Sequence, residues 1–307
     1  MEKPIPLVID TDIGDNIDDS LALAIACRAP EVDLRAITTV HGDTIKRAEL
    51  ARGILSLGGA QKVPVAPGCE RPLIAPVERQ TPLLYDVHPK RPLQRDDLNR
   101  DAVEVLLRLS RQHGRVSLLT IGPLTNVAVA LRLHPELEQT LEITAMAGAF
   151  HLDRAETNVR LDPEAAQIVF ASRAPVRVIP LDVTIECPLA MWVPEALAAS
   201  RDELKRSLGR ACRIWQERTG RDIVLPHDPI ALVAAIYPEL FVFEPMRIEV
   251  ALHPDDRRGR LLAVPRPDSN VHVATRADLD QISSYILERL AVTEQRRGNS
   301  RCPPAQS

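Results

Sequence analysis

The chain has 307 residues, and its 45% apolar and 26% charged residues are typical of globular proteins, which excludes a chain that is disordered as a whole. Its formal net charge of −4 comes from 42 acidic residues against 38 lysines and arginines, which are dispersed and form no basic stripe for a nucleic-acid backbone. Aromatic residues make up only 3%, too few for the stacking platforms that hold single-stranded nucleic acid. We therefore expect no nucleic-acid partner.

Strand-like and helix-like runs alternate from the start of the chain. The first four are a strand at 5–9, a helix at 20–28, a strand at 34–40 and a helix at 45–57. The pattern resumes with a helix at 101–112, a strand at 116–121, a helix at 126–133 and strands at 141–146 and 176–179. This alternation indicates repeated βαβ units and predicts an α/β fold with a mostly parallel, Rossmann-like central sheet flanked by helices.

Two segments interrupt this pattern. Residues 63–94 are rich in proline and lack periodicity, which predicts a long excursion over the surface that could form a wall or lid of a site. Residues 296–307 are basic, then Pro-Pro and polar, and we expect this tail to be disordered. Because no flexible break divides the rest, the sequence predicts a single domain over residues 1–295.

The N-terminus and the cysteines bear on the cellular compartment. The apolar run in MEKPIPLVID is too short for a signal peptide, and no stretch of about 18 uncharged apolar residues occurs. The five cysteines are widely spaced and include no CxxC pair, which argues against a disulfide framework or a zinc site. We expect a cytoplasmic protein without a membrane partner.

Five aspartates lie within ten residues at the end of the first predicted strand; they are Asp10, Asp12, Asp15, Asp18 and Asp19. Open parallel sheets bind their ligands at the carboxyl ends of strands, so a site is expected here. Several carboxylates this close together stay ionised only when a cation compensates their charge. Because all the donors are hard oxygens, the cluster predicts Ca²⁺ or Mg²⁺. The alternative is that Asp18 only caps the next helix and the other acids are solvated.

Further polar segments follow later strands. The segment VHGD, which ends in Asp43, would lie beside the acidic cluster if the first two strands are neighbours, although a polar turn also explains it. Thr125 could present a backbone carbonyl to a metal or simply cap the next helix. Glu156 and Asn158, in a loop before a helix, could hold sugar hydroxyls. His227 precedes an acid at the start of an apolar helix, where a structural role is an equally simple explanation.

Taken together, these segments resemble the inosine-uridine type nucleoside hydrolase family. In chain order they are DTDIGDNIDDSLAL, ITTVHGD, VPVAPGCERPL, TIGPLTNVAVAL, MAGAF, AETN with DPEAA, and HDPIA. The resemblance extends from Leu7 to about Leu290. It implies a single α/β domain that binds one Ca²⁺ and hydrolyses the N-glycosidic bond of ribonucleosides to ribose and free base. It also implies a homodimer or homotetramer.

The resemblance further implies a role for each matching residue. Ca²⁺ would be held by Asp12, Asp19, the carbonyl oxygen of Thr125, and Asp228. Asp12 would also be the general base that deprotonates the attacking water, and His227 the general acid at the leaving base. The remaining implied roles are contact with the substrate for Asp18, Asp43, Met146, Glu156, Asn158 and His227, and support of the metal ligands for Asp10.

Four features depart from the family pattern. Two extra residues in the acidic motif give DxDxGxxxDD in place of DxDxGxDD, and the metal ligands are retained. Asp43 and Thr157 replace an asparagine and a phenylalanine, which alters contacts around the base and the ribose. The segment between Met146 and Glu156 is shortened and lacks an asparagine that often contacts the ribose 5′-hydroxyl. A His-Gly-x-x-Gly element with a second histidine beside the base is missing, and His88 alone could replace it.

Other functions remain open at this point. His227 lies where purine-specific relatives carry tryptophan, which favours pyrimidine or broad specificity. The change at Asp43 and the missing histidine also fit a homologue that binds nucleosides or ribose without turnover. A haloacid-dehalogenase-type phosphohydrolase likewise begins with a strand ending in DxD, but it expects a Gly-Thr pair where this chain has Ile13-Gly14. No role is assigned to Asp15.

Overall fold

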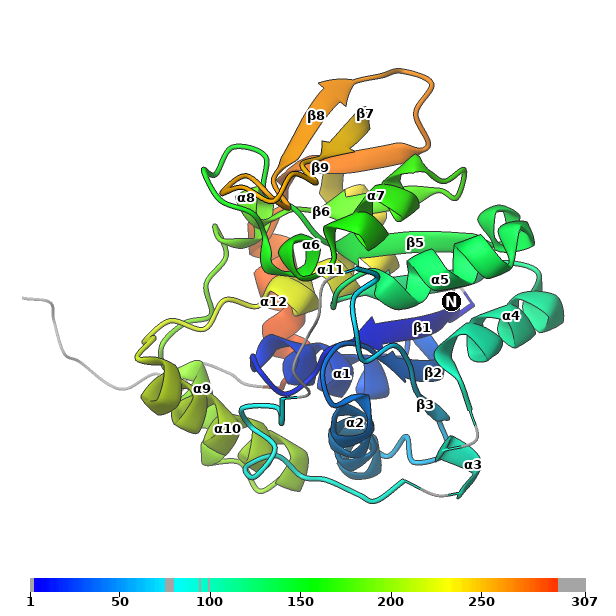
Figure 1. The fold of residues 1–307 in the computed structure, drawn as a ribbon. Helices are drawn as coiled ribbons and strands as arrows, with labels where there is room; N and C mark the ends of the chain where they lie inside the picture. The colour runs from blue at the N-terminus through cyan, green and yellow to red at the C-terminus, as the bar shows by residue number, and fades with distance from the viewer. Residues whose placement is uncertain (1–2, 75–79, 94, 99, 292–307) are drawn as a thin grey trace, which may run out of the picture.

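The computed structural model describes residues 3–74, 80–93, 95–98 and 100–291, and a nine-stranded sheet runs through its centre (Figure 1). The strand order is β3-β2-β1-β4-β5-β6-β9-β7-β8. The strands are β1 (Ile5–Thr11), β2 (Val32–Thr39), β3 (Val65–Pro67), β4 (Val116–Thr120), β5 (Leu141–Met146), β6 (Val176–Ile179), β7 (Phe241–Val250), β8 (Leu261–Pro265) and β9 (Val271–Ala277). Strands β1 to β6 and β9 pair in parallel, whereas β7 is antiparallel to both β9 and β8.

Helices cover both faces of this sheet (Figure 1). The longer ones are α1 (Asp18–Arg28), α2 (Thr44–Gly58), α4 (Ala102–His113), α5 (Thr125–Leu133), α7 (Pro163–Ala171), α10 (Glu203–Thr219), α11 (His227–Ile236) and α12 (Leu279–Arg289). The shorter ones are α3 (Arg95–Leu98), α6 (Thr157–Leu161), α8 (Leu181–Thr184), α9 (Val193–Ala198) and the 3₁₀ turns η1 (Pro135–Gln139) and η2 (Pro238–Leu240). In the part of the chain that the structure describes, no helix combines the length and apolarity needed to cross a membrane.

The central strand β1 shows why the sheet is buried on both faces. Leu7, Val8 and Ile9 are all fully buried. Leu7 and Ile9 belong to a core cluster with side chains of α1, α2, α10, α11 and α12, whereas Val8 belongs to a second cluster with α4, α5 and α7. Successive residues of a strand point to opposite faces, so a continuous apolar run such as that of β1 is required when helices cover both.

The predicted fold class is confirmed. The chain forms a single α/β domain with a mostly parallel central sheet, and every strand and helix predicted up to residue 179 is present with ends within two residues of those expected. Residues 63–94 are only partly a surface excursion, because β3 lies within them and the side chains of Leu84 and His88 are buried. The predicted tail at 296–307 lies outside the described residues.

The carboxyl ends of the central strands meet in the middle of the sheet. Asp10 of β1 lies between Thr38 of β2 and Thr120 of β4 in the strand register. Helix α1 follows β1 after a short loop, and α11 packs against α1. The N-termini of both helices therefore face the same end of the sheet, where their dipoles favour negative charge.

Candidate active site

A cavity of about 500 Å³ opens at this end of the sheet. Its volume is within the range that protein pockets offer to small molecules. Its polar lining consists of the acids Asp12, Asp15, Asp18, Asp19, Glu156 and Asp228, the bases His41, Arg154, Arg221 and His227, and Asn16, Thr157 and Asn158. Its apolar lining includes Ile121, Met146, Leu161, Leu181 and Leu225. The walls are therefore strongly acidic, with a few cationic side chains.

Three of these acids form a group that could hold a metal ion. One carboxylate oxygen from each of Asp18, Asp19 and Asp228 lies within 4.8 Å of the other two, and all three residues are buried. Asp18 and Asp19 begin α1, and Asp228 lies in the first turn of α11. Sequence analysis had placed Asp19 and Asp228 together as metal ligands but had assigned Asp18 to the ribose. The structure brings all three to one point.

Burial and mutual repulsion raise the pKa values of this group. Loss of solvent is the largest cause for Asp18, whose pKa rises to about 7, and the neighbouring Asp12 raises it further. The pKa values of Asp19 and Asp228 lie well above the usual range, again first because of burial and then because of the other carboxylates. A divalent cation bound by these oxygens would relieve the repulsion. The donor set thus fits a hard divalent cation.

Asp12 approaches the same cavity from the end of β1. Burial raises its pKa to about 6, and the positive charge of Arg47 is the largest opposing influence. Gly122, just after β4, makes room for Asp12, because a Cβ atom at this glycine would lie 3.1 Å from Asp12 Oδ1. The hydroxyl of Thr11 donates a hydrogen bond to Asp19, which ties the end of β1 to the start of α1.

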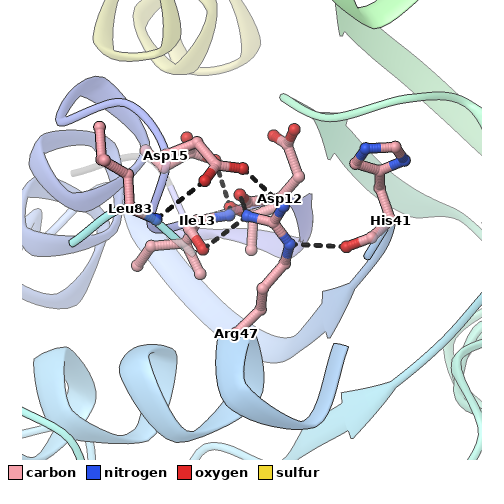
Figure 2. A network of polar contacts seen from close by, with 8 residues as sticks. Asp12, Ile13, Asp15, His41, Arg47 and Leu83 are labelled. Carbon is pink, nitrogen blue, oxygen red and sulfur yellow. Dashed lines mark hydrogen bonds and ion pairs between the residues drawn. The ribbon is translucent and has the colours of Figure 1, made fainter. Parts of the chain in front are cut away.

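The guanidinium of Arg47, on α2, lies beneath the loop that carries Asp12 (Figure 2). It donates hydrogen bonds to the backbone carbonyl oxygens of Asp12, of Ile13 at 2.9 Å and of His41 at 2.6 Å, and it pairs with the carboxylate of Asp15 at 2.7 Å. Its side chain is only 2% exposed. Arg47 was not identified from the sequence. Its ion pair with Asp15 gives a defined partner to a residue that had no assigned role.

Asp10 lies behind the cavity, outside the residues that line it. Its Oδ1 atom accepts hydrogen bonds at 2.5 Å from the hydroxyl of Thr38 and at 2.7 Å from Nδ2 of Asn126. Its Oδ2 atom is buried and has no hydrogen-bond partner among the described residues. Burial raises the pKa of Asp10 to about 7, so this carboxyl readily carries a proton near neutrality.

Glu156 and Asn158 line the cavity, yet many of their polar atoms bind the protein itself. The Glu156 carboxylate is the N-cap of α6 and accepts hydrogen bonds from the backbone N–H groups of Gly148, Asn158 and Val159 at 2.7–3.1 Å. The side-chain amide of Asn158 donates to the carbonyl of Met146 at 3.0 Å. These bonds fix the wall formed by the end of β5 and the start of α6.

His227 lies in the cavity wall beside two arginines. Its Nδ1 atom is 2.7 Å from the hydroxyl oxygen of Thr184 in α8. Burial, followed by the charges of Arg154 and Arg221, lowers its pKa to about 4. The imidazole is therefore neutral at pH 7. Neither arginine was identified from the sequence, because an isolated arginine in a loop resembles any solvated residue.

Three further candidates are not among the residues that line the cavity. The carboxylate of Asp43 is the N-cap of α2 and accepts a hydrogen bond from the backbone N–H of Lys46 at 3.1 Å. The hydroxyl of Thr125 donates to Asp162 at 2.7 Å. His88 is buried with Nε2 3.1 Å from the hydroxyl oxygen of Ser20, so it does not take the place of the missing histidine beside the base.

The chain is similar to known proteins over most of its length. Residues 7–284 match the family model described as inosine-uridine preferring nucleoside hydrolase. A probable uridine nucleosidase 1 from Oryza sativa subsp. japonica is 32% identical over 257 residues, which are 78% of each chain. The inosine-uridine preferring nucleoside hydrolase of Crithidia fasciculata is 28% identical over 94% of this chain and 98% of its own. The solved structure of a plant nucleoside hydrolase superposes with a TM-score of 0.83 at 26% identity, covering 94% of this chain and 99% of that one.

Proposed function

The chain belongs to the inosine-uridine preferring nucleoside hydrolase family, and we propose that it cleaves the N-glycosidic bond of ribonucleosides with one Ca²⁺ bound in the acidic cavity. As a family member it is a hydrolase that acts on the N-glycosyl bonds of ribonucleosides. The metal, the roles of individual residues and the preferred base are our proposals. The buried group of Asp18, Asp19 and Asp228 is the observation that carries the proposed metal site.

Asp12, Asp19 and Asp228, which line the cavity, are the proposed ligands of Ca²⁺. The backbone carbonyl of Thr125, which is not among the lining residues, is a proposed ligand on the family resemblance alone. When bound, Ca²⁺ would hold the ribose hydroxyls and polarise the attacking water. Asp18 lies at the same point and serves to clamp the ribose hydroxyls or to complete the ligand set. Ca²⁺ sites typically combine carboxylate and carbonyl oxygens of the protein with oxygens of water or substrate.

Asp12 is the proposed general base. A catalytic base works best when its pKa lies near the working pH, and burial raises the pKa of Asp12 to about 6. In the metal-free protein it is therefore ionised at neutral pH but more basic than a solvated aspartate, and a bound cation would lower its pKa. The reaction passes through an oxocarbenium-like ribosyl cation, which the ring of carboxylates stabilises electrostatically.

His227 is the proposed hydrogen-bond donor to the leaving base. Its lowered pKa means that it acts as a neutral imidazole, which donates one N–H bond but stores no extra proton. Arg154 and Arg221 line the same wall and add positive charge where the departing base becomes negative. The three side chains together would stabilise the leaving group.

Pyrimidine nucleosides, or a broad range of nucleosides, are the proposed substrates. One similar protein is named as a probable uridine nucleosidase and another as inosine-uridine preferring, which supports this choice. The only two tryptophans of the chain, Trp192 and Trp215, do not line the cavity, so no indole is available there to stack on a purine.

A substrate panel tests this proposal. Uridine, cytidine, inosine and adenosine would be incubated with the protein, and released ribose measured as reducing sugar, before and after removal of divalent metal with EDTA. We expect release from uridine at least, its loss with EDTA and its return with Ca²⁺. The Asp12→Asn variant should lose activity by about 10²–10⁴-fold, the usual contribution of a general base, whereas Asp268→Asn, at an exposed residue paired with Arg266 outside the cavity, is the control. Calorimetric binding of ribose without turnover in the wild type would instead favour the binding homologue.

A further inference from the structure

The loop between β1 and α1, residues 12–17, is held by a buried arginine, Arg47. We propose that Arg47 is a positioning residue that fixes this loop, and with it Asp12, for metal binding, and that Asp15 serves to hold Arg47. The inference rests on the proposed function, because it concerns the Ca²⁺ site proposed above. Arg47 was not singled out from the sequence, and Asp15 had no assigned role.

The guanidinium is committed to the loop on several sides. Nη1 donates to the carbonyl oxygens of Asp12 and Ile13, Nε donates to the carbonyl of His41, and Nη2 pairs with Asp15 (Figure 2). The carbonyls of Asp12 and Ile13 are thereby turned towards α2. A buried guanidinium that lost these acceptors would pay a large desolvation cost, so the loop and Arg47 stabilise one arrangement together.

The charge of Arg47 has a second consequence. A guanidinium remains protonated at every physiological pH, so Arg47 compensates part of the negative charge of the cavity whether or not a cation is bound. It does so from α2, which carries its side chain. Asp12 can therefore be held close to Asp19 and Asp228 before the metal arrives, which reduces the reorganisation that metal binding requires.

Asp15 anchors Arg47 from the outer side. Its Oδ2 atom accepts from Arg47 Nη2, and its Oδ1 atom accepts from the backbone N–H of Leu83 at 3.0 Å. Leu84 N–H in turn donates to the carbonyl of Gly14 at 2.8 Å. Asp15 is one of the residues that line the cavity, and its side chain is 50% exposed. Both of its carboxylate oxygens already accept hydrogen bonds from the protein. Its geometry suits a clamp on Arg47.

Gly14 shows how closely the loop fits its surroundings. It has a positive φ of 118°, and a Cβ atom there would lie 2.6 Å from Leu50 Cδ1 and 2.7 Å from Pro82 Cβ. The loop is therefore packed between α2 and the segment after residue 80. Its conformation depends on neighbours that are distant in sequence, and among them Arg47 makes polar contacts with Asp12 itself and with Ile13 and Asp15 after it.

Metal-free protein with Arg47→Met, and separately with Arg47→Lys, provides the test. Arg52→Met is the matched control, because Arg52 lies on the same helix, is 14% exposed, donates to the carbonyls of Gln61 and Val63 at 3.1 Å and pairs with Asp97. Ca²⁺ affinity would be measured by titration calorimetry, and backbone hydrogen exchange of residues 13–17 by mass spectrometry.

We expect Arg47→Met to weaken Ca²⁺ binding by about 10–100-fold, the usual effect of removing a residue that orients metal ligands, and to speed exchange in the loop. Arg47→Lys should recover part of the affinity, and Arg52→Met should change neither measurement even if it lowers the melting temperature. Equal Ca²⁺ affinity in wild type and Arg47→Met, or equal losses in Arg47→Met and Arg52→Met, would overturn the role of Arg47.

Failure of the proposed metal site can be told apart from failure of the role of Arg47. A wild-type protein that binds no Ca²⁺ would overturn the proposed metal site. Backbone hydrogen exchange in wild type and Arg47→Met would then decide whether Arg47 still orders residues 13–17. If Arg47→Met does not fold, Asp15→Asn keeps the buried guanidinium and its backbone bonds while weakening its anchor. Asp15→Asn should weaken Ca²⁺ binding and speed loop exchange, and unchanged values for both would contradict the proposal.

Discussion

His227 Nδ1 lies 2.7 Å from the hydroxyl oxygen of Thr184, so the imidazole in the cavity wall is anchored by a residue of α8. One ring nitrogen is thereby engaged with the protein, whereas the other has no hydrogen-bond partner among the described residues and could serve a ligand. Because burial and two nearby arginines keep the ring neutral at pH 7, this nitrogen is a hydrogen-bond donor only in one tautomer. The Thr184 contact can select that tautomer by donating to Nδ1.

The first prediction concerns His227→Ala. We expect the turnover of uridine and inosine to fall by about 10²-fold or more, because these bases leave poorly without a hydrogen-bond donor. Turnover of p-nitrophenyl ribofuranoside should change much less, since p-nitrophenolate leaves without one. Steady-state assays of the two substrate types measure this difference. Equal losses for both types would mean that His227 supports the structure of the site and does not serve the leaving group.

The second prediction concerns the arginines near His227. Their positive charges disfavour a protonated imidazole, so Arg154→Gln and Arg221→Gln should each raise the pKa of His227 from about 4 towards its ordinary value. Burial is the larger cause and stays in place, so the rise should be partial. NMR titration of the His227 ring protons measures it. Arg206→Gln, an exposed residue of α10 that donates to the carbonyl of Ser200, is the control and should leave this pKa unchanged.

The third prediction links pH, metal and stability. Burial raises the pKa of Asp18 to about 7 and that of Asp12 to about 6 in the folded protein. The unfolded chain releases these protons near pH 4, so the metal-free protein should lose stability as the pH rises from about 4 to about 7. Ca²⁺ competes with the same protons, and its stabilising effect should grow over this range.

Calorimetric melting at about pH 5 and about pH 7.5, with EDTA or with excess Ca²⁺, tests this linkage. The rise in melting temperature caused by Ca²⁺ should be larger at the higher pH. Comparing the two conditions at each pH cancels the titration of groups remote from the site. A Ca²⁺ effect that is constant or larger at the lower pH would show that these carboxylates do not bind the metal.

Much of the fold was predictable because local signals agreed with the final packing. The apolar run of β1 is buried on both faces, as its sequence indicated, whereas α1 begins two residues earlier than predicted, so that Asp18 and Asp19 stand in its first turn. Parallel strands place their carboxyl ends together, so a site could be predicted at the acids after β1. Only the family resemblance assigned Asp228, in the first turn of α11, to the same site. The order of these segments along the chain agrees with that of a known family.

The parts that were missed depend on tertiary contacts. Arg47 lies in a helix among charged residues, and nothing local separates it from a solvated arginine, although its side chain is 2% exposed in the fold. The carboxylate of Asp43 caps α2, and its expected contact with the substrate stays a prediction. Strand β7 was not predicted, because this strand near the antiparallel edge of the sheet is largely half-buried or exposed and lacks a clean apolar pattern.

The fourth prediction concerns Gly122→Ala. The added Cβ would lie 2.9 Å from the backbone nitrogen of Asp12, 3.1 Å from its Oδ1 and 2.8 Å from Val40 Cγ1, so Asp12 must shift. Misplacement of a catalytic group by about 1 Å can lower the rate by about 10²-fold, and we expect a loss of this order in kcat/KM for uridine. Weaker Ca²⁺ binding should accompany it.

Gly114→Ala is the matched control for Gly122→Ala. Gly114 has a φ of +76° and no atom within 4 Å of an added Cβ, so alanine there strains the backbone without touching the cavity. Gly114→Ala should lower stability by about 1 kcal/mol and leave kcat/KM unchanged. Thermal melting and uridine kinetics on both variants separate the two effects. If Gly122→Ala keeps full activity and Ca²⁺ affinity, the position of Asp12 tolerates a shift, and its proposed double role as ligand and base would be wrong.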